Sequence, residues 1–329
     1  MKLDTVIAKI NKQYGDNTIG FAKNLKYTEV ERLSSGSLFL DWALGQNKLT
    51  KESGWPMGRV VELYGPESSG KSLISLKTIV EAQKKGFGCA YIDCENSFDK
   101  NFAASLGVNV NDLILTRESQ AEKVIDLVCN LFEQTNDIKV VVFDSLASMI
   151  PKIIEEDALE DAQMAPMARV MSKGLPKLIL KNKNNALVIF INQLRMKPGV
   201  IHGNPEYTPG GNSLKYYSSL RVDVRRGDWI FADEDNKKRV GQFVKFRLTK
   251  NKSAIPQKEG YFKYLYTGVL DRVDELISLG ILNGTVTRRG SYYDLGEQSY
   301  QGREQMEVAL KNNAKLFERA RNDVFQEKI

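Results

Sequence analysis

Cysteine and histidine are scarce in this chain of 329 residues. Its three cysteines are Cys89, Cys94 and Cys129, and no CxxC pair occurs, so the sequence indicates neither a zinc site nor a disulfide framework. We expect these cysteines to be small buried residues. The single histidine, His202, excludes metal clusters built on histidine and argues against a Ser-His-Asp triad.

Long apolar runs and a strong net charge are also lacking. No apolar run approaches the roughly 18 residues that a membrane helix needs, and the first four residues do not resemble a signal peptide. We therefore expect no membrane partner and a location in a reducing cytoplasm. The 47 basic and 41 acidic residues give a net charge of +6, which permits polyanion binding without arguing for it, because most charges face solvent.

The order of apolar patterns predicts three parts, with boundaries at 1–33, 34–267 and 268–329. Apolar residues between Leu3 and Tyr14 follow helical spacing, and this stripe could pack on its own domain or on a neighbouring subunit. In the second part, runs such as "KVVVFD" and "ALVIFIN" indicate strands covered on both faces. We therefore predict an α/β core with a mainly parallel central sheet, a short N-terminal helical segment and a small C-terminal α/β domain.

The expected elements of the core alternate along the chain. Strands are expected at 59–64, 89–93, 113–116, 139–144, 186–192, 220–225 and 242–249, and helices at 72–85, 120–134 and 166–181. The last two strands could extend the sheet as antiparallel additions. In the C-terminal part we expect a helix over 269–279, a strand over 291–295 and a helical end over 303–325.

A glycine-rich loop stands between the first strand and the first helix of the core. The run Gly65-Pro66-Glu67-Ser68-Ser69-Gly70-Lys71-Ser72 fits G-x-x-x-x-G-K-[ST], whose backbone N–H groups surround phosphate oxygens. The helix N-terminus adds partial positive charge at the same place. Lys71 is expected to reach the β- and γ-phosphates, and the Ser72 hydroxyl to complete a Mg²⁺ shell. The loop therefore predicts nucleotide binding.

Polar residues at three strand ends are expected beside this loop. Asp144 ends a hydrophobic strand in the Walker B manner and would hold Mg²⁺ through its water shell, with Ser145 assisting. Glu95 is a candidate general base that orients water toward the γ-phosphorus, although a solvated loop carboxylate explains its position equally well. Gln193 could hydrogen-bond a γ-phosphate and report the nucleotide state to the segment that follows it.

That following segment, 196–211, is rich in glycine and proline. A long loop of this kind inside a compact domain is usually functional or mobile. Its backbone amides, together with Arg195 and Lys197, suit a contact that follows a nucleic-acid backbone. A simple flexible loop explains the composition equally well.

Several ordered motifs together resemble the bacterial RecA recombinase family. They are "GPESSGKS", "YIDCENSFD", "VVVFDSLASMIPK", "FINQLRMKPGV", "GNPEYTPGGNSLKYY" and "KNKSAIP", and the similarity covers about residues 1–310. The resemblance implies a DNA-dependent ATPase that uses ATP and Mg²⁺, forms helical filaments on single-stranded DNA, and catalyses homologous pairing and strand exchange in recombinational repair. The implied partners are single-stranded DNA, double-stranded DNA and further copies of the chain. Whether a self-cleaving repressor is another partner stays open.

The resemblance also implies roles for individual residues. Glu95 matches the catalytic glutamate, Gln193 the γ-phosphate sensor, and Lys250 and Lys252 the lysines that reach the ATP of the neighbouring subunit. Asp99 and Phe102 match adenine contacts, Tyr216 an interface aromatic, and Leu3–Tyr14 the helix that docks on the adjacent protomer. The implied DNA-binding positions in or beside the loops 156–164 and 194–210 are Met164, Arg169, Arg195, Met196, Lys197, Gly199, Asn204, Gly210 and Gly211.

The chain departs from the family pattern around the first DNA loop. Pro166 and Pro176 are expected to kink that loop and the helix after it, because proline removes a helical hydrogen bond. The acidic run over 151–163 would repel DNA, so any contact there would use backbone N–H groups, Met164 or nearby arginines. An exposed acidic helix end is the alternative.

Two other functions are alternatives for the same core. A ring helicase would need a trans-acting arginine and usually an N-terminal domain, whereas the segment before the core has only about thirty residues and the trans residues match lysines. A nucleotide-gated adaptor without hydrolysis would lack the base, whereas Glu95 and Asp144 are both present.

Overall fold

The structure is a computed structural model that describes residues 2–16, 18–21, 30–156, 166–197, 199, 203, 205–232, 235 and 237–326. Two compact units are distinguished, Met1–Val30 and Glu31–Ile329. The first contains helix α1 (Leu3–Tyr14), none of whose residues is buried. The Asn11 side chain donates to the Ile19 carbonyl and accepts from its N–H, both at 2.9 Å, which fixes the chain where the helix ends.

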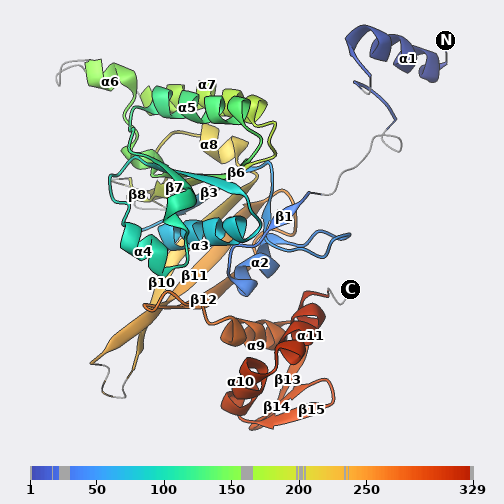
Figure 1. Cartoon of the computed structure of the whole chain (residues 1–329), viewed down its shortest axis with the longest axis vertical. Helices are drawn as coiled ribbons and strands as arrows, with labels where there is room; N and C mark the ends of the chain where they lie inside the picture. Colours follow the sequence, from blue (N-terminus) through green and yellow to red (C-terminus); the bar gives the residue numbers. More distant parts are fainter. Residues whose placement is uncertain are drawn as a thin grey trace. The chain divides into compact units, whose positions relative to one another are not determined.

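The second unit is built on one eight-stranded sheet with the order β12-β11-β10-β3-β7-β6-β4-β5 (Figure 1). Strands β10, β3, β7, β6, β4 and β5 are parallel to one another, and β11 and β12 are antiparallel additions beside β10 at one edge. The bounds are β3 Val60–Gly65, β4 Gly88–Asp93, β5 Leu113–Thr116, β6 Ile138–Asp144, β7 Leu187–Gln193, β10 Leu220–Phe231, β11 Arg239–Asn251 and β12 Glu259–Leu265. The predicted mainly parallel sheet is confirmed.

Helices cover both faces of this sheet, which explains the unbroken apolar runs. Along β6, Val140 and Val142 join one core while Val141 and Phe143 join the other, because successive side chains point to opposite faces. The first core includes α3 (Lys71–Lys84) and the end of α4 (Lys100–Ser105), and the second includes α5 (Ala121–Gln134), α7 (Pro166–Lys181) and α8 (Ser213–Tyr217).

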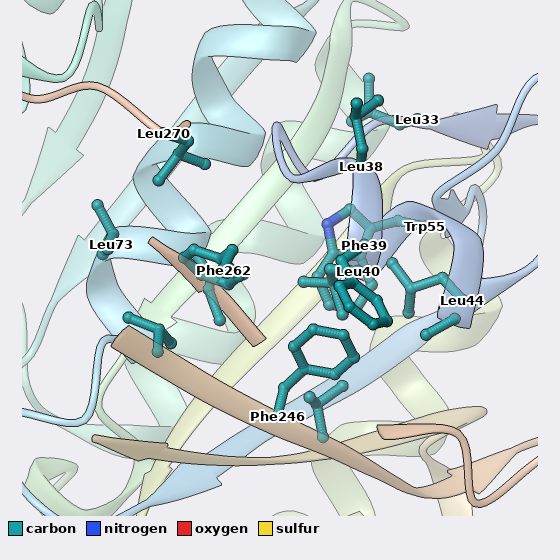
Figure 2. Packing of buried hydrophobic residues seen from close by; sticks show 14 of the residues in the cluster. Leu33, Leu38, Phe39, Leu40, Leu44, Trp55, Leu73, Phe246, Phe262 and Leu270 are labelled. Carbon is teal, nitrogen blue, oxygen red and sulfur yellow. The ribbon is translucent and has the colours of Figure 1, made fainter. Parts of the chain in front are cut away.

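A short helix, α2 (Leu38–Leu44), thickens the first core beside β11 and β12 (Figure 2). Phe39 packs edge-on against Phe246, with ring centroids 6.0 Å apart. Trp55 lies in β2 (Trp55–Pro56), which pairs with β1 (Arg32–Leu33), and its indole N–H donates to Thr78 Oγ1 at 2.9 Å. Burial and this hydrogen bond of Trp55 therefore hold the end of the segment that joins α2 to β2.

The C-terminal part adds three helices and a three-stranded sheet. These are α9 (Arg272–Leu282), β13 (Val286–Arg289), β14 (Tyr292–Leu295), β15 (Gln298–Gln301), α10 (Arg303–Asn312) and α11 (Ala314–Phe325). The expected helical end over 303–325 is two helices, because the Asn313 side chain accepts from Leu316 N–H at 3.0 Å and caps the second. Leu276 and Leu279 join the same core as α2, and the domain boundaries expected from the sequence stay a prediction.

Two further elements differ from expectation. Helix α7 continues through Pro176 to Lys181, so the proline does not interrupt it. Strands β10 and β11 run well beyond the expected ends, with a register irregularity between Arg226 and Trp229 that lets the pairing resume after Gly227. No helix among the described residues is long and apolar enough to cross a membrane.

A buried carboxyl group joins α9 to the start of α2. Glu275 is 1% exposed, and its Oε2 accepts from Ser37 Oγ at 2.5 Å and from the Phe39 N–H at 2.8 Å. Burial raises the pKa of Glu275 to about 8, and the nearby Asp41 carboxyl adds to the rise while Arg272 opposes it. Burial likewise raises the pKa of Asp41 to about 6. The protonated form of Glu275 therefore stabilises this junction.

We predict that Glu275→Gln stabilises the protein at alkaline pH. Because the folded pKa lies above the usual 4.5, the contribution of Glu275 is complete below about 4.5 and is lost as pH rises through about 8. Each unit of pKa difference is worth ~1.4 kcal/mol. Thermal melting of parent and variant should agree near pH 4 and favour the variant above pH 8. An exposed control, Glu297→Gln, should follow the parent throughout, and a parent curve that stays flat would contradict the assignment.

Candidate nucleotide site

The glycine-rich loop lies where β3 ends and α3 begins, as the sequence predicts. Gly70 precedes α3 with φ of +104°, and a Cβ there would lie 3.1 Å from a Val244 methyl carbon, so glycine fits both the conformation and the space. No side chain caps the N-terminus of α3 and no acidic residue lies in its first turn. The N–H groups of that turn therefore point to a place suited to phosphate.

Lys71 lies under this loop. Its side chain is 7% exposed, and Nζ donates to the Gly65 carbonyl at 3.1 Å and to the Pro66 carbonyl at 2.6 Å. Burial lowers the pKa of Lys71, while Asp144 and Glu95 oppose that shift. The ammonium group is thus held by backbone carbonyls that a phosphate can replace as its partner.

Ser72 and Asp144, the two residues expected to bind metal, are brought together. Ser72 Oγ donates to Asp144 Oδ2 at 2.8 Å, and Tyr91 OH donates to the same oxygen at 2.5 Å. Burial raises the pKa of Asp144, and these two hydrogen bonds oppose the rise. No group of three or more His, Cys, Asp or Glu residues in the described part of the chain could hold a metal. One carboxylate and one hydroxyl fit Mg²⁺, which takes its remaining ligands from phosphates and water.

Glu95 and Gln193 meet at the same edge of the sheet. Glu95 Oε1 accepts from Gln193 Nε2 at 2.8 Å, from Ser145 Oγ at 2.5 Å and from Ser148 Oγ at 3.2 Å. Glu95 is therefore a fixed and hydrogen-bonded group, which disfavours the alternative of a freely solvated loop carboxylate. Its role as a base stays a prediction.

A buried aspartate holds the turn that carries Glu95. Asp93 is fully buried, and its carboxylate oxygens accept from the Ser97 and Phe98 N–H groups, each at 3.0 Å. Arg117 lies 3.9 Å from the same carboxylate. Sequence reasoning treated Asp93 only as the end of a strand, although an aspartate within a buried strand is itself a sign of a required polar contact.

The residues expected near adenine lie on α4. Asp99 caps this helix, because its Oδ1 accepts from the Asn101 N–H at 2.7 Å and the Phe102 N–H at 3.1 Å. Phe102 is partly buried against the first core. The geometry accounts for Asp99 as a helix cap, and adenine contacts stay a prediction for both residues.

Lys250 is bonded to α8 rather than to the phosphate loop. Its Nζ donates to the Lys215 carbonyl at 2.5 Å and to the Tyr216 carbonyl at 3.1 Å, at the C-terminal end of α8. Burial lowers the pKa of Lys250, and the charges of Lys252 and Arg221 lower it further. The Lys252 side chain and the neighbouring Tyr216 ring are exposed, as expected for residues that would meet another subunit.

Two short strands near the ends of the segment expected to contact DNA pair with each other and form a two-stranded ribbon. Strand β8 (Arg195–Met196) pairs with β9 (Glu206–Tyr207), and the side chains of Arg195, Met196 and Lys197 are exposed. Lys197 Nζ lies 5.8 Å from the Tyr207 ring centroid. Glu206 is held by two hydrogen bonds from Arg225, at 2.8 and 2.6 Å, which lower the pKa of Glu206.

Both ends of this loop are tied to the nucleotide site. The Leu194 N–H donates to the Gly65 carbonyl at 3.3 Å. Asn192 Nδ2 donates to the Pro209 carbonyl at 3.1 Å and to the buried Glu62 Oε1 at 2.9 Å. Sequence reasoning missed Asn192 and Glu62, and their signal is a polar residue inside an otherwise apolar strand.

The other expected DNA-binding residues fall into two groups. Arg169 is exposed on α7, Gly199 lies within the loop, and Gly210 and Gly211 follow β9 with φ of +89° and +73°. A Cβ on Gly211 would lie 2.7 Å from Ala168 Cβ, so the loop returns to the sheet through a close approach to α7. Met164, Asn204 and nearly all of the loop 156–164 lie outside the described residues.

Comparisons with known proteins agree with this architecture. The family model described as the RecA N-terminal domain matches residues 1–271. Protein RecA of Cereibacter sphaeroides is 40% identical over 314 residues, covering 94% of this chain and 89% of that protein. Protein RecA of Mesomycoplasma hyopneumoniae is 39% identical over 326 residues, covering 98% and 94%. The crystal structure of the RadB recombinase shares the fold, with a TM-score of 0.52 at 21% identity, covering 72% of this chain and 97% of that one.

The fold and the site define a P-loop protein with a mainly parallel sheet and a loop tied to the phosphate-binding edge. The chain belongs to the RecA family. It is a recombinase with a role in DNA recombination and repair. Membership implies a DNA-dependent ATPase that uses ATP, binds DNA and forms filaments.

We predict that Asp93→Asn destabilises the protein, because an amide group replaces one of two buried oxygens that accept backbone N–H groups. Leaving such a donor without a partner costs about 1–3 kcal/mol. Urea denaturation measures the loss. The control Asp126→Asn removes an exposed partner of Lys177 and should change stability little, because exposed ion pairs are screened by solvent. Equal losses in the two variants would show that Asp93 does not hold the turn.

Proposed function

We propose that the chain is a Mg²⁺-dependent ATPase whose nucleotide state controls a helical filament on single-stranded DNA, and that this filament pairs and exchanges homologous strands. One observation carries the proposal. The expected base Glu95 and the expected γ-phosphate sensor Gln193 share a hydrogen bond of 2.8 Å at the edge of the phosphate loop. Gln193 also stands two residues before the exposed ribbon strand β8.

The proposed hydrolysis uses groups that already face this edge. Lys71 exchanges its backbone carbonyl partners for the β- and γ-phosphates. The Gln193 amide leaves Glu95 for a γ-phosphate oxygen, which removes one of the three donors on Glu95 Oε1 and makes the carboxylate a better acceptor for a proton from the attacking water. Mg²⁺ held by Ser72 and Asp144 would neutralise charge on the phosphates. The serine hydroxyls of Ser145 and Ser148 keep the Glu95 carboxylate oriented.

The same exchange would act on the DNA loop. Gln193 is covalently joined to Leu194, whose N–H is bonded to the phosphate loop, and Asn192 holds the other end of the loop at Pro209. Movement of the Gln193 side chain toward a γ-phosphate would therefore displace the residues that lead into β8, the first strand of the ribbon. To shift the protein from a mostly inactive to a mostly active conformation, ATP must bind the active conformation more tightly by about 5 kcal/mol. A few charge-assisted hydrogen bonds can supply this difference.

Assembly would complete the site from a second copy. Lys250 lies near the end of β11 and Lys252 directly follows that strand. Both would reach the γ-phosphate bound by the neighbouring protomer, after Lys250 leaves the α8 carbonyls. Helix α1 has no buried residue, which supports its proposed role as the element that docks on the adjacent protomer.

We predict that Glu95→Gln binds ATP and assembles on single-stranded DNA without turnover, because an amide cannot accept the proton from water. Loss of a general base costs about 10²–10⁴-fold in rate. Phosphate release and electron microscopy of filaments measure the two properties. The control Glu81→Gln, which changes a half-buried glutamate on α3 that pairs with Lys84, should hydrolyse ATP normally. Turnover by Glu95→Gln at the parent rate would remove Glu95 from the role of base.

We predict that Arg195→Ala and Lys197→Ala each weaken binding to single-stranded DNA. Loss of one phosphate contact should reduce the log–log salt slope by about 0.7. Fluorescence anisotropy with a labelled oligonucleotide at several salt concentrations measures this slope. Lys84→Ala changes an exposed lysine paired with Glu81 on α3 and should leave the slope unchanged. A slope that neither loop variant alters would place the DNA contact elsewhere.

A further inference from the structure

A buried tyrosine hydroxyl lies at the nucleotide site, beside the residues given roles above. Tyr91 is 3% exposed, and its hydroxyl donates to Asp144 Oδ2 at 2.5 Å. The same carboxylate oxygen accepts from Ser72 Oγ at 2.8 Å. Asp144 is therefore held by one hydroxyl from β4 and one from α3.

Strand register explains how Tyr91 reaches this carboxylate. Strands β4 and β6 are parallel, with Tyr91 opposite Val142 and Asp93 opposite Asp144. Side chains at alternate positions share a face of the sheet, so Tyr91 is the diagonal neighbour of Asp144 on the face that α3 covers.

The ring of Tyr91 is fixed by its surroundings. It packs against Phe98 with centroids 5.0 Å apart, and the Phe98 N–H is held by the Asp93 carboxylate at 3.0 Å. Few rotamers are open to a ring enclosed in this way, so the hydroxyl oxygen has a defined position. The Tyr91 hydroxyl therefore sets the orientation of the Asp144 carboxylate through its hydrogen bond.

Packing alone does not require the hydroxyl. Phenylalanine would fill nearly the same volume, whereas a buried hydroxyl must find a partner or lose stability. Here the partner is the carboxylate that the proposed function assigns to Mg²⁺, and groups that orient a metal ligand typically alter metal affinity or activity by about 10–100-fold.

We propose that Tyr91 is a positioning residue for the Mg²⁺ site. The inference rests on the proposed role of Asp144 in binding Mg²⁺. Ser72 and Tyr91 both donate to Asp144 Oδ2. If the Ser72 hydroxyl served as a Mg²⁺ ligand, the Tyr91 hydroxyl would remain as the donor that keeps the carboxylate in one orientation.

The test is a Mg²⁺ titration of the binding of a fluorescent ATP analogue to Tyr91→Phe. The concentration of Mg²⁺ at half-maximal effect should rise about 10-fold or more. Affinity for the analogue in EDTA should stay at the parent value, because Lys71 and the backbone of the phosphate loop are unchanged. Tyr264→Phe, which changes a buried tyrosine on β12, should match the parent in both measurements.

Two outcomes would overturn the inference. One is an unchanged Mg²⁺ midpoint, and the other is an equal loss of affinity with and without Mg²⁺, which would show a general packing role. A second comparison places Tyr91→Phe in an Asp144→Asn background, where it should have no further effect on the midpoint, since coupled residues are not additive. If the parent itself binds the analogue without regard to Mg²⁺, the proposed Mg²⁺ site is wrong, and the inference that rests on it is wrong as well.

Discussion

The hydrogen bond between Gln193 Nε2 and Glu95 Oε1 is the interaction on which this account depends. It joins the residue expected to abstract a proton with the residue expected to sense the γ-phosphate. While the bond persists, the oxygen that would receive the proton is occupied by three donors. A γ-phosphate that attracts the Gln193 amide would therefore remove a donor from Glu95 and displace the start of the DNA loop, both through one exchange of hydrogen-bond partners.

Buried polar groups around the Glu95–Gln193 hydrogen bond confine this exchange of partners to the loop. Asp93 fixes the turn that carries Glu95, and Asn192 fixes the far end of the loop. Asn192 is itself held by a hydrogen bond to Glu62 of the central strand β3. Arg221 completes the buried cluster by donating to Glu62 Oε2 at 2.5 Å. Because the Asp93, Asn192 and Glu62 side chains are buried and paired, the loop ribbon is the part of the network that can move at the lowest cost.

Much of this arrangement follows from the sequence. The apolar runs of β6 and β7 predict strands covered on both faces, and the carboxyl ends of parallel strands share one edge. Asp144, Glu95 and Gln193 are therefore expected beside the glycine-rich loop, and the structure brings them together there. The residue types then suggest the chemistry of a metal ligand, a base and a sensor.

Other features needed the tertiary structure. The contact of Asn192 with Pro209 spans a loop whose path has no periodic signal, and the bond from Lys250 to α8 joins segments far apart in sequence. The expected end of β10 came too early because the apolar alternation weakens around Arg226, where a register irregularity keeps the pairing in place. Strand β14 matches the strand expected over 291–295, whereas β13 and β15 are short and mostly exposed, so their sequences carry little pattern.

Hydrogen–deuterium exchange of the amides in 194–211 tests the central claim most directly. With Mg²⁺ and a non-hydrolysable ATP analogue, exchange in this segment should differ from that with ADP, and Gln193→Ala should abolish the difference. Identical exchange of the parent protein with the two nucleotides would contradict the account, because the γ-phosphate would then have no effect on the loop.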